Sequence, residues 1–185
     1  MYEIRIHGRG GQGAKALAQI LAEAAILDGK EGRAFPEYGP ERSGAPVASF
    51  VRISEEPIKT YEPVTTPDAV LVLDETLAGA VDFLDGLASD KILIINSREN
   101  KKALKEKIDF KGKIISINAK KISFEEIGEN RPNIPILGAF IKAAKDIIDP
   151  KNIEKSIKDI FLKKIGEEKT EKNIKAFKKA YDQVS

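Results

Sequence analysis

The chain of 185 residues contains no cysteine, no tryptophan, one methionine and one histidine. Without a thiolate it can form no disulfide, use no cysteine nucleophile and supply none of the thiolates that normally hold an iron–sulfur cluster. Because His7 is the single histidine, a zinc site built from several imidazoles is also excluded. Any demanding redox chemistry must come from a bound cofactor or from another chain.

Long apolar runs are missing as well. Runs such as residues 93–95 are far shorter than the roughly 18 residues of a membrane span. Residues 1–6 alternate apolar and charged side chains as a half-buried strand does, so we expect no secretory signal and no membrane contact. With 42% apolar and 32% charged residues, the composition is typical of a soluble globular protein. We therefore expect a single domain over residues 1–185, located in the cytoplasm.

Positive charge is not in excess: 31 Lys and Arg stand against 29 Asp and Glu, a net charge of +2. This balance argues against a nucleic-acid partner. The Lys-rich stretch at residues 163–179 is typical of a solvated helix surface, although it could dock an acidic partner such as a ferredoxin domain. Five of the seven arginines lie in the first 52 residues. Since guanidinium groups suit fixed recognition of carboxylate or phosphate, the amino-terminal third is the expected recognition face.

Hydrophobic periodicity predicts an α/β protein. The expected strands cover residues 4–7, 33–36, 47–53, 69–73, 92–95 and 114–117. The expected helices cover residues 14–27, 76–87, 99–108, 135–148, 151–163 and 169–184. Residues 58–61 are expected to pair back on 47–53 as a hairpin. The predicted fold class is thus a Rossmann-like α/β fold, with a mostly parallel sheet flanked by helices, an antiparallel hairpin insertion and a helical carboxyl end.

A glycine loop joins the first expected strand to the first expected helix. Gly8, Gly10 and Gly13 occupy the three glycine positions of the dinucleotide-binding fingerprint, and Glu37 is a candidate for its acidic residue. Glycines let the backbone approach a phosphate, and a helix amino end offers free N–H groups to an anion. A tight turn without any ligand explains the same glycines.

Two observations argue against a nicotinamide or flavin site. Arg9 and Gln12 put bulky polar side chains into the turn, and the second expected strand leads into a proline-rich loop instead of a crossover helix. A phosphate-binding P-loop fits worse, because Lys15 falls one residue late and no Ser or Thr follows it to hold magnesium.

Four stretches of the sequence resemble the gamma subunit of pyruvate and related 2-oxoacid:ferredoxin oxidoreductases. They are residues 7–13 (HGRGGQG), 34–46 (AFPEYGPERSGAP), 74–77 (DETL) and 133–139 (NIPILGA). The long second stretch is the most specific, and its Glu-Arg-Ser-Gly ending is more similar to the pyruvate or 2-oxoisovalerate branch than to the 2-oxoglutarate branch.

The resemblance implies a complex that converts a 2-oxoacid and coenzyme A to acyl-CoA and carbon dioxide, with reduction of ferredoxin. It implies no cofactor in this chain, and thiamine diphosphate and iron–sulfur clusters on companion alpha, beta and delta subunits. Contact with coenzyme A or with a partner subunit is the role implied for this chain, without catalytic residues of its own. The residues implied for that contact are Gly8, Arg9, Gly10, Gly11, Gln12, Gly13, Glu37, Tyr38, Glu41 and Arg42.

A parallel sheet would collect these loops at one edge. The glycine loop, residues 37–44, Asp74, Glu75, Asn96 and Asn118 all follow carboxyl ends of expected strands, the side where open α/β sheets bind ligands or partners. There Arg9 and Arg42 could meet phosphates of coenzyme A or carboxylates of a partner chain. Alternatively, Arg42 could pair with Glu37 or Glu41 and brace its own loop.

The remaining candidates have structural explanations. His7 is expected to be a structural histidine rather than an acid or base. Asp74 and Glu75 point apart and are expected to cap the following helix rather than bind metal. Asn133 and Pro135 fit the start of a helix whose N–H groups could hold an anion. Two other functions stay open: a free-standing dinucleotide-dependent oxidoreductase, and a purely structural assembly subunit.

Overall fold

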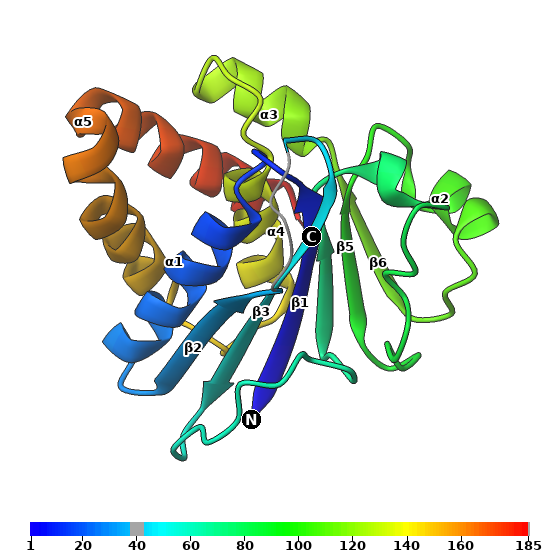
Figure 1. Cartoon of the computed structure of the whole chain (residues 1–185). Helices are drawn as coiled ribbons and strands as arrows, with labels where there is room; N and C mark the ends of the chain where they lie inside the picture. The colour runs from blue at the N-terminus through cyan, green and yellow to red at the C-terminus, as the bar shows by residue number, and fades with distance from the viewer. Residues whose placement is uncertain (38–42, 185) are drawn as a thin grey trace.

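The computed structural model describes residues 1–37 and 43–184, in which six strands form one sheet in the order β2-β3-β1-β4-β5-β6 (Figure 1). The strands are β1 (Tyr2–Arg9), β2 (Glu31–Pro36), β3 (Pro46–Ser54), β4 (Ala69–Val72), β5 (Ile92–Asn96) and β6 (Lys113–Ile117). The helices are α1 (Ala14–Leu27), the short 3₁₀ helix η1 (Glu75–Leu77), α2 (Lys101–Lys107), α3 (Ala119–Glu126), α4 (Asn133–Ala143) and α5 (Pro150–Gln183).

The order of the strands determines where the loops meet. β3 runs antiparallel to both of its neighbours, β2 and β1, whereas β1, β4, β5 and β6 pair in parallel. From β1 the chain passes through α1 to the edge strand β2, and from β4 it passes to β5 on the other side of β1. The two connections therefore diverge between β1 and β4, which is the position where open α/β sheets form a crevice for ligands.

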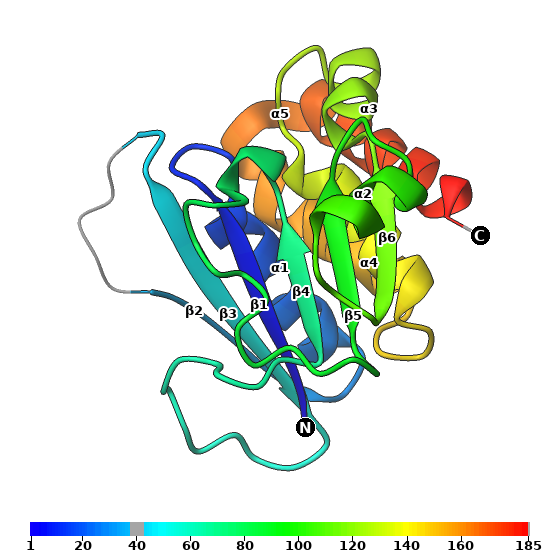
Figure 2. The ribbon, with the colours of Figure 1, turned by 90° about the vertical axis from the view of Figure 1, so that its right-hand side faces the viewer.

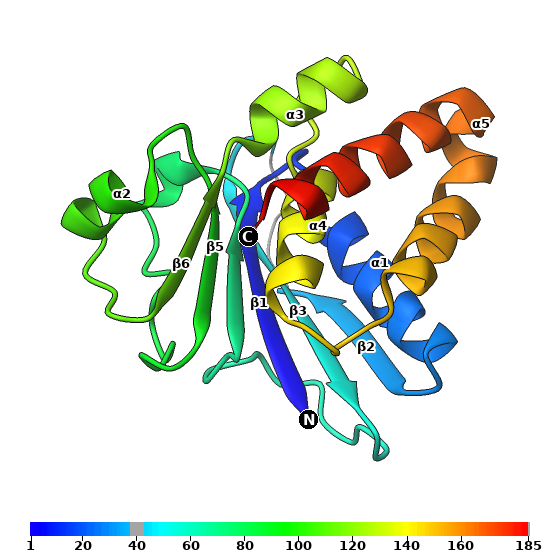
Figure 3. The ribbon, with the colours of Figure 1, turned by 180° about the vertical axis from the view of Figure 1, so that it is seen from behind.

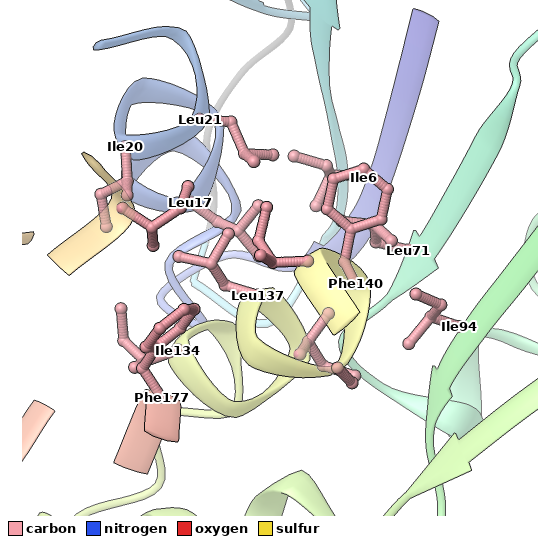
Figure 4. Packing of buried hydrophobic residues seen from close by; sticks show 14 of the residues in the cluster. Ile6, Leu17, Ile20, Leu21, Leu71, Ile94, Ile134, Leu137, Phe140 and Phe177 are labelled. Atoms are coloured by element: carbon pink, nitrogen blue, oxygen red, sulfur yellow. The ribbon is translucent and has the colours of Figure 1, made fainter. Parts of the chain in front are cut away.

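Helices α1, α4 and α5 cover one face of the sheet, and α2 lies on the opposite face (Figures 1 and 3). The larger core lies under α1, α4 and α5. In it Phe140 of α4 lies near Ile6 and Leu71 of the strands, and Leu137 of α4 lies on the side toward Leu17 of α1 (Figure 4). A second apolar cluster, drawn from residues 70–114, packs between the opposite face and α2. The central strands β4 and β5 are thus buried on both faces, as their continuous apolar sequences require.

Helix α5 is bent at Gly166, whose φ of 78° and ψ of 170° are not helical. Only glycine adopts this conformation without steric strain. The bend separates two helical halves, which confirms the break expected between residues 163 and 169. It also leaves the last turn before Gly166, which carries Lys164, beside the start of α1.

One pairing of the expected topology is wrong, although the α/β fold class is confirmed. Residues 58–61 form no strand, because β2 and β1 already occupy both edges of β3. The antiparallel insertion also separates the first and second strands, which a simple β-α-β unit would place side by side.

The helix expected from Thr76 to Leu87 is also absent, and η1 ends at Leu77. Gly79 and Gly86 have positive φ there, which interrupts any helix. In contrast, α3 forms from a segment of mixed polarity that the periodicity did not single out. Among the described residues, no helix is both long and apolar enough to cross a membrane.

Close packing of α4 on α5 supplies a test of the fold. A Cβ at Gly138 would lie 2.3 Å from the carbonyl oxygen of Phe177 and 3.0 Å from the backbone nitrogen of Tyr181. We expect Gly138→Ala to lower the free energy of unfolding by about 1–3 kcal/mol, because the two helices would be forced apart. Urea unfolding measures this change. The control Lys175→Ala, on the exposed face of α5, should change it by less than about 0.5 kcal/mol. Equal stability of the two variants would contradict the close packing.

Candidate functional site

The carboxyl ends of β1, β4, β5 and β6 lie at one edge of the sheet (Figure 2). The glycine loop follows β1, Asp74 follows β4, Asn96 ends β5 and Asn118 follows β6. The end of β2 and the start of β3 lie at the same edge, because β3 runs in the opposite direction. The expectation that these polar residues share one rim is therefore confirmed.

The glycine loop turns sharply into α1. Gly11 and Gly13 have φ of 93° and 85°, values that favour glycine. Gly8 has ordinary φ but little space, since a Cβ there would lie 3.1 Å from Cδ1 of Leu73. Gly13 is the N-cap of α1 and provides no side-chain cap. The first N–H groups of α1 are consequently left without a capping side chain and can donate to an anion.

Residues 43–46, which we call the returning segment, pair with the glycine loop. The backbone N–H of Gly10 donates to the carbonyl of Ala45 at 2.9 Å, and that of Gly44 donates to the carbonyl of Gly10 at 3.1 Å. Together with the pairing of Arg9 and Pro46, these bonds continue the β1–β3 ladder beyond the sheet. The loop and the returning segment are thus one hydrogen-bonded unit.

Arg9 braces this unit against the turn after β4. Its Nε and Nη2 donate to Oγ1 of Thr76 at 3.0 and 2.9 Å, and its Nη1 donates to the carbonyl of Gly44 at 3.1 Å. Its side chain remains 29% exposed. The guanidinium, which the sequence placed on a phosphate or a partner carboxylate, is engaged here mainly with oxygens of its own chain.

Gln12 and Asp74 meet across the crevice between β1 and β4. Nε2 of Gln12 donates to Oδ2 of Asp74 at 2.6 Å, and the N–H of Thr76 donates to Oδ1 at 2.9 Å, so that Asp74 caps η1 as expected. Burial by itself would raise the pKa of Asp74, but the hydrogen bonds from Thr76 and Gln12 and the charge of Arg9 outweigh it and lower the pKa. Asp74 is therefore ionised at neutral pH.

A cavity of about 550 Å³ lies beside this network, between the start of α1 and the adjoining ends of β2 and β3. Among its lining residues are Arg9, Gly10, Gly11, Gly13, Lys15, Glu37 and Lys164. Five of the residues proposed from the sequence line it. Gly8 and Gln12 do not, and Tyr38, Glu41 and Arg42 lie outside the described residues, so their suggested contacts stay predictions.

Sequence reasoning missed two cations at the cavity. Lys15 follows the glycine loop directly, and the fingerprint comparison considered it only as a misplaced P-loop lysine. Lys164 lies about 150 residues later, in a stretch expected to be solvated helix surface, and comes to the cavity through the bend at Gly166. No local pattern could have shown that proximity.

The geometry does not favour dinucleotide binding. β3 lies between β1 and β2, so the strand that ends near Glu37 is two places from β1, roughly 10 Å instead of the 5 Å of adjacent strands. In addition, Gln12 and Asp74 occupy the crevice that a dinucleotide would need. The residues described by the structure also hold no cluster of three or more side chains suited to a metal ion.

His7 lies beneath the rim on the face of β1 that carries Arg5, with its ring centroid 6.4 Å from that of Phe83. Burial, and next the charge of Arg5, lower the pKa of His7 to about 4. The imidazole is neutral at physiological pH, and its Nε2 has no hydrogen-bond partner within the described part of the chain. These features fit the structural role expected for His7.

The buried imidazole predicts a pH dependence of stability. The unfolded chain binds a proton at His7 below about pH 6.5, whereas the folded chain binds it only below about pH 4. The stabilisation is therefore complete above about pH 6.5 and is lost progressively as the pH falls to about 4, by about 3 kcal/mol. Urea unfolding of wild type and His7→Leu across this range should give curves that diverge by that amount. Parallel curves would show that His7 titrates normally.

Comparisons with known proteins agree along the whole chain. The model of the family described as pyruvate ferredoxin/flavodoxin oxidoreductase matches residues 3–183. Pyruvate synthase subunit PorC of Thermotoga maritima is 43% identical over 99% of this chain and 94% of its own length. The pyruvate/ketoisovalerate oxidoreductases common subunit gamma of Pyrococcus furiosus is 44% identical over 100% of this chain and 97% of its own.

Solved structures show the same fold. The crystal structure of pyruvate oxidoreductase subunit PORC from Thermotoga maritima superposes with a TM-score of 0.85 at 40% identity, covering 100% of this chain and 97% of that one. The 2-oxoglutarate:ferredoxin oxidoreductase of Magnetococcus marinus, solved with 2-oxoglutarate, coenzyme A and succinyl-CoA bound, matches with a TM-score of 0.76 over 31% of its chain, and at 22% identity this likeness concerns the fold. With its sequence matched from end to end and its fold shared, the chain belongs to the pyruvate ferredoxin/flavodoxin oxidoreductase family.

Proposed function

We propose that this chain is the gamma subunit of a multi-subunit 2-oxoacid:ferredoxin oxidoreductase that acts on pyruvate. The observation that carries the proposal is the 43–44% identity, over nearly the full length of both chains, with subunits named for pyruvate synthase and for the pyruvate/ketoisovalerate oxidoreductases. The complex oxidatively decarboxylates the 2-oxoacid, transfers the acyl group to coenzyme A and passes two electrons to ferredoxin. The free-standing dinucleotide enzyme is not favoured, since the crevice it needs is occupied by Gln12 and Asp74.

The chemistry of this chain supports a division of labour between subunits. A sequence without cysteine cannot hold iron–sulfur clusters by thiolates. We therefore assign the clusters and thiamine diphosphate to companion alpha, beta and delta chains, and we place the complex in the cytoplasm. Residues 1–185, built around one six-stranded sheet, act in this proposal as a single gamma domain.

The cavity beside the glycine loop fits the phosphates of coenzyme A. It carries three cations, Arg9, Lys15 and Lys164, against the carboxylate of Glu37, and the uncapped start of α1 adds backbone N–H donors. Its volume of about 550 Å³ lies within the usual range of small-molecule sites, roughly 300–1,000 Å³. Bound there, coenzyme A would supply the acyl-accepting thiol, while this chain would hold and orient its anionic part.

A subunit without a redox centre should be inactive by itself. We expect the purified chain to show no pyruvate-dependent reduction of an electron acceptor, and addition of the alpha, beta and delta chains to restore it. An assay with methyl viologen measures both states. Activity of the isolated chain would contradict the proposal, as would tight binding of NAD or FAD.

The two lysines at the cavity test the role in coenzyme A binding. We expect Lys15→Ala and Lys164→Ala, assayed in the assembled complex, each to raise the KM for coenzyme A roughly fivefold, since each removes about 1 kcal/mol of attraction to a phosphate. The KM for pyruvate should not change. Lys158→Ala removes an exposed lysine of α5 that does not line the cavity, and it serves as the matched control.

An unchanged KM for coenzyme A in both variants, with full assembly, would instead support a purely structural subunit. Loss of assembly without any change in KM for the complex that does form would indicate that the cations meet carboxylates of a partner chain.

A further inference from the structure

Asp74 connects two segments that are far apart in the sequence, the glycine loop and the turn after β4. Its two carboxylate oxygens accept hydrogen bonds from Nε2 of Gln12 at 2.6 Å, from the N–H of Thr76 at 2.9 Å and from Oγ1 of Thr76 at 2.6 Å. Nε of Arg9 lies 3.7 Å from Oδ2, and the Asp74 side chain is 19% exposed. One carboxylate thus contacts the glycine loop at two side chains and the turn after β4 at a third.

The effect of Asp74 extends to the returning segment through Arg9. Thr76, whose hydroxyl is held by Asp74, accepts from the Arg9 guanidinium, which donates in turn to the carbonyl of Gly44. Gly44 also donates to the carbonyl of Gly10 in the glycine loop. Arg9 and Gly10 form part of the cavity wall. Their hydrogen bonds to Thr76 and Gly44, which do not line the cavity, therefore hold that part of the wall in place.

The hydrogen-bond donors and acceptors allow only one arrangement of the contact between Gln12 and Asp74. Oε1 of Gln12 accepts from the backbone N–H of Arg9 at 2.8 Å, so the amide must present its Nε2 to residue 74. Residue 74 must then present an acceptor to Gln12 and another to Thr76, which a carboxylate does. A carboxamide at residue 74 would either face Nε2 with its own N–H group or withdraw its oxygen from Thr76.

We propose that Asp74 is a positioning residue that holds the glycine loop and the returning segment in the arrangement that shapes the cavity. Asp74 does not line this cavity; together with Gln12 and Thr76 it lines a smaller hollow of about 250 Å³ near the ends of β4, β5 and β6. The link to coenzyme A rests on the proposed function: Asp74 controls the affinity of the complex for coenzyme A and takes no part in the chemistry.

The test uses the assembled complex with Asp74→Asn. The KM for coenzyme A should rise about tenfold, the scale of one lost charge-assisted hydrogen bond, while kcat falls by less than about twofold. The matched control is Asp68→Asn at the opposite end of β4. Asp68 has a similarly shielded carboxylate, 23% exposed, which accepts from the N–H of Glu3 and pairs with Lys91. Its loss should affect stability and leave the KM for coenzyme A unchanged.

An exchange of the two side-chain types distinguishes positioning from general destabilisation. In the double variant Gln12→Glu, Asp74→Asn, the carboxylate at residue 12 accepts from the N–H of Arg9 and from the side-chain amide at residue 74. The oxygen of that amide can still accept from Thr76. The KM should return to within about twofold of the wild type. The single variant Gln12→Glu sets two carboxylates against each other and should raise the KM. If Lys15→Ala or Lys164→Ala raises the KM for coenzyme A, then an unchanged KM in Asp74→Asn, an equal rise in Asp68→Asn, or no recovery in the double variant overturns the proposal.

Hydrogen–deuterium exchange separates this proposal from the assignment of coenzyme A. Asp74→Asn should speed exchange of the amides of Gly10 and Gly44, and the double variant should slow it again. If exchange responds in this way while no cavity variant alters the KM for coenzyme A, the coenzyme A assignment fails and the positioning role of Asp74 stands. If exchange at both amides is unchanged, the positioning role fails whatever the cavity binds.

Discussion

The insertion of β3 between β2 and β1 is the constraint on which the rest of the site depends. Its inward side chains Val51 and Ile53 are buried in the main core, so the strand cannot leave the sheet without exposing them. Because β3 runs antiparallel to β1, its first residues arrive at the rim where β1 ends. Two segments separated by more than 30 residues are thereby joined by backbone hydrogen bonds next to the start of α1.

The same insertion explains why a glycine-rich fingerprint does not make a dinucleotide site here. The cavity forms on the α1 side of β1, against the displaced ends of β2 and β3, while the Gln12–Asp74 hydrogen bond bridges the crevice between β1 and β4. Asp74 stays ionised in this contact, since three hydrogen-bond donors and a nearby guanidinium compensate the cost of its partial burial. The rim thus has two parts: a hydrogen-bonded network around Asp74, and a cavity lined by the cations Lys15 and Lys164.

Local patterns predicted most elements but few of their pairings. The apolar stripe of α1 and the continuous apolar run of β4 were found, because burial imposes those patterns on the sequence. The helix expected after Thr76 failed because Gly79 and Gly86 adopt positive φ, which composition does not reveal. The prediction that residues 58–61 pair with β3 was wrong, because the sequence of a strand does not specify which neighbour it pairs with. The pairing of β3 with β1 and β2 follows from core packing.

The sequence by itself determined the family, the fold class and the absence of cluster ligands, since these follow from which residues are present and in what order. It also located the polar residues at the ends of strands. Only the tertiary structure decided that Lys164 reaches the cavity, that Arg9 braces the returning segment, and that Asp74 holds Gln12. Those contacts join residues that are 35 to about 150 positions apart in the sequence. Whether such residues meet in space depends on how the whole sheet packs and on the bend at Gly166.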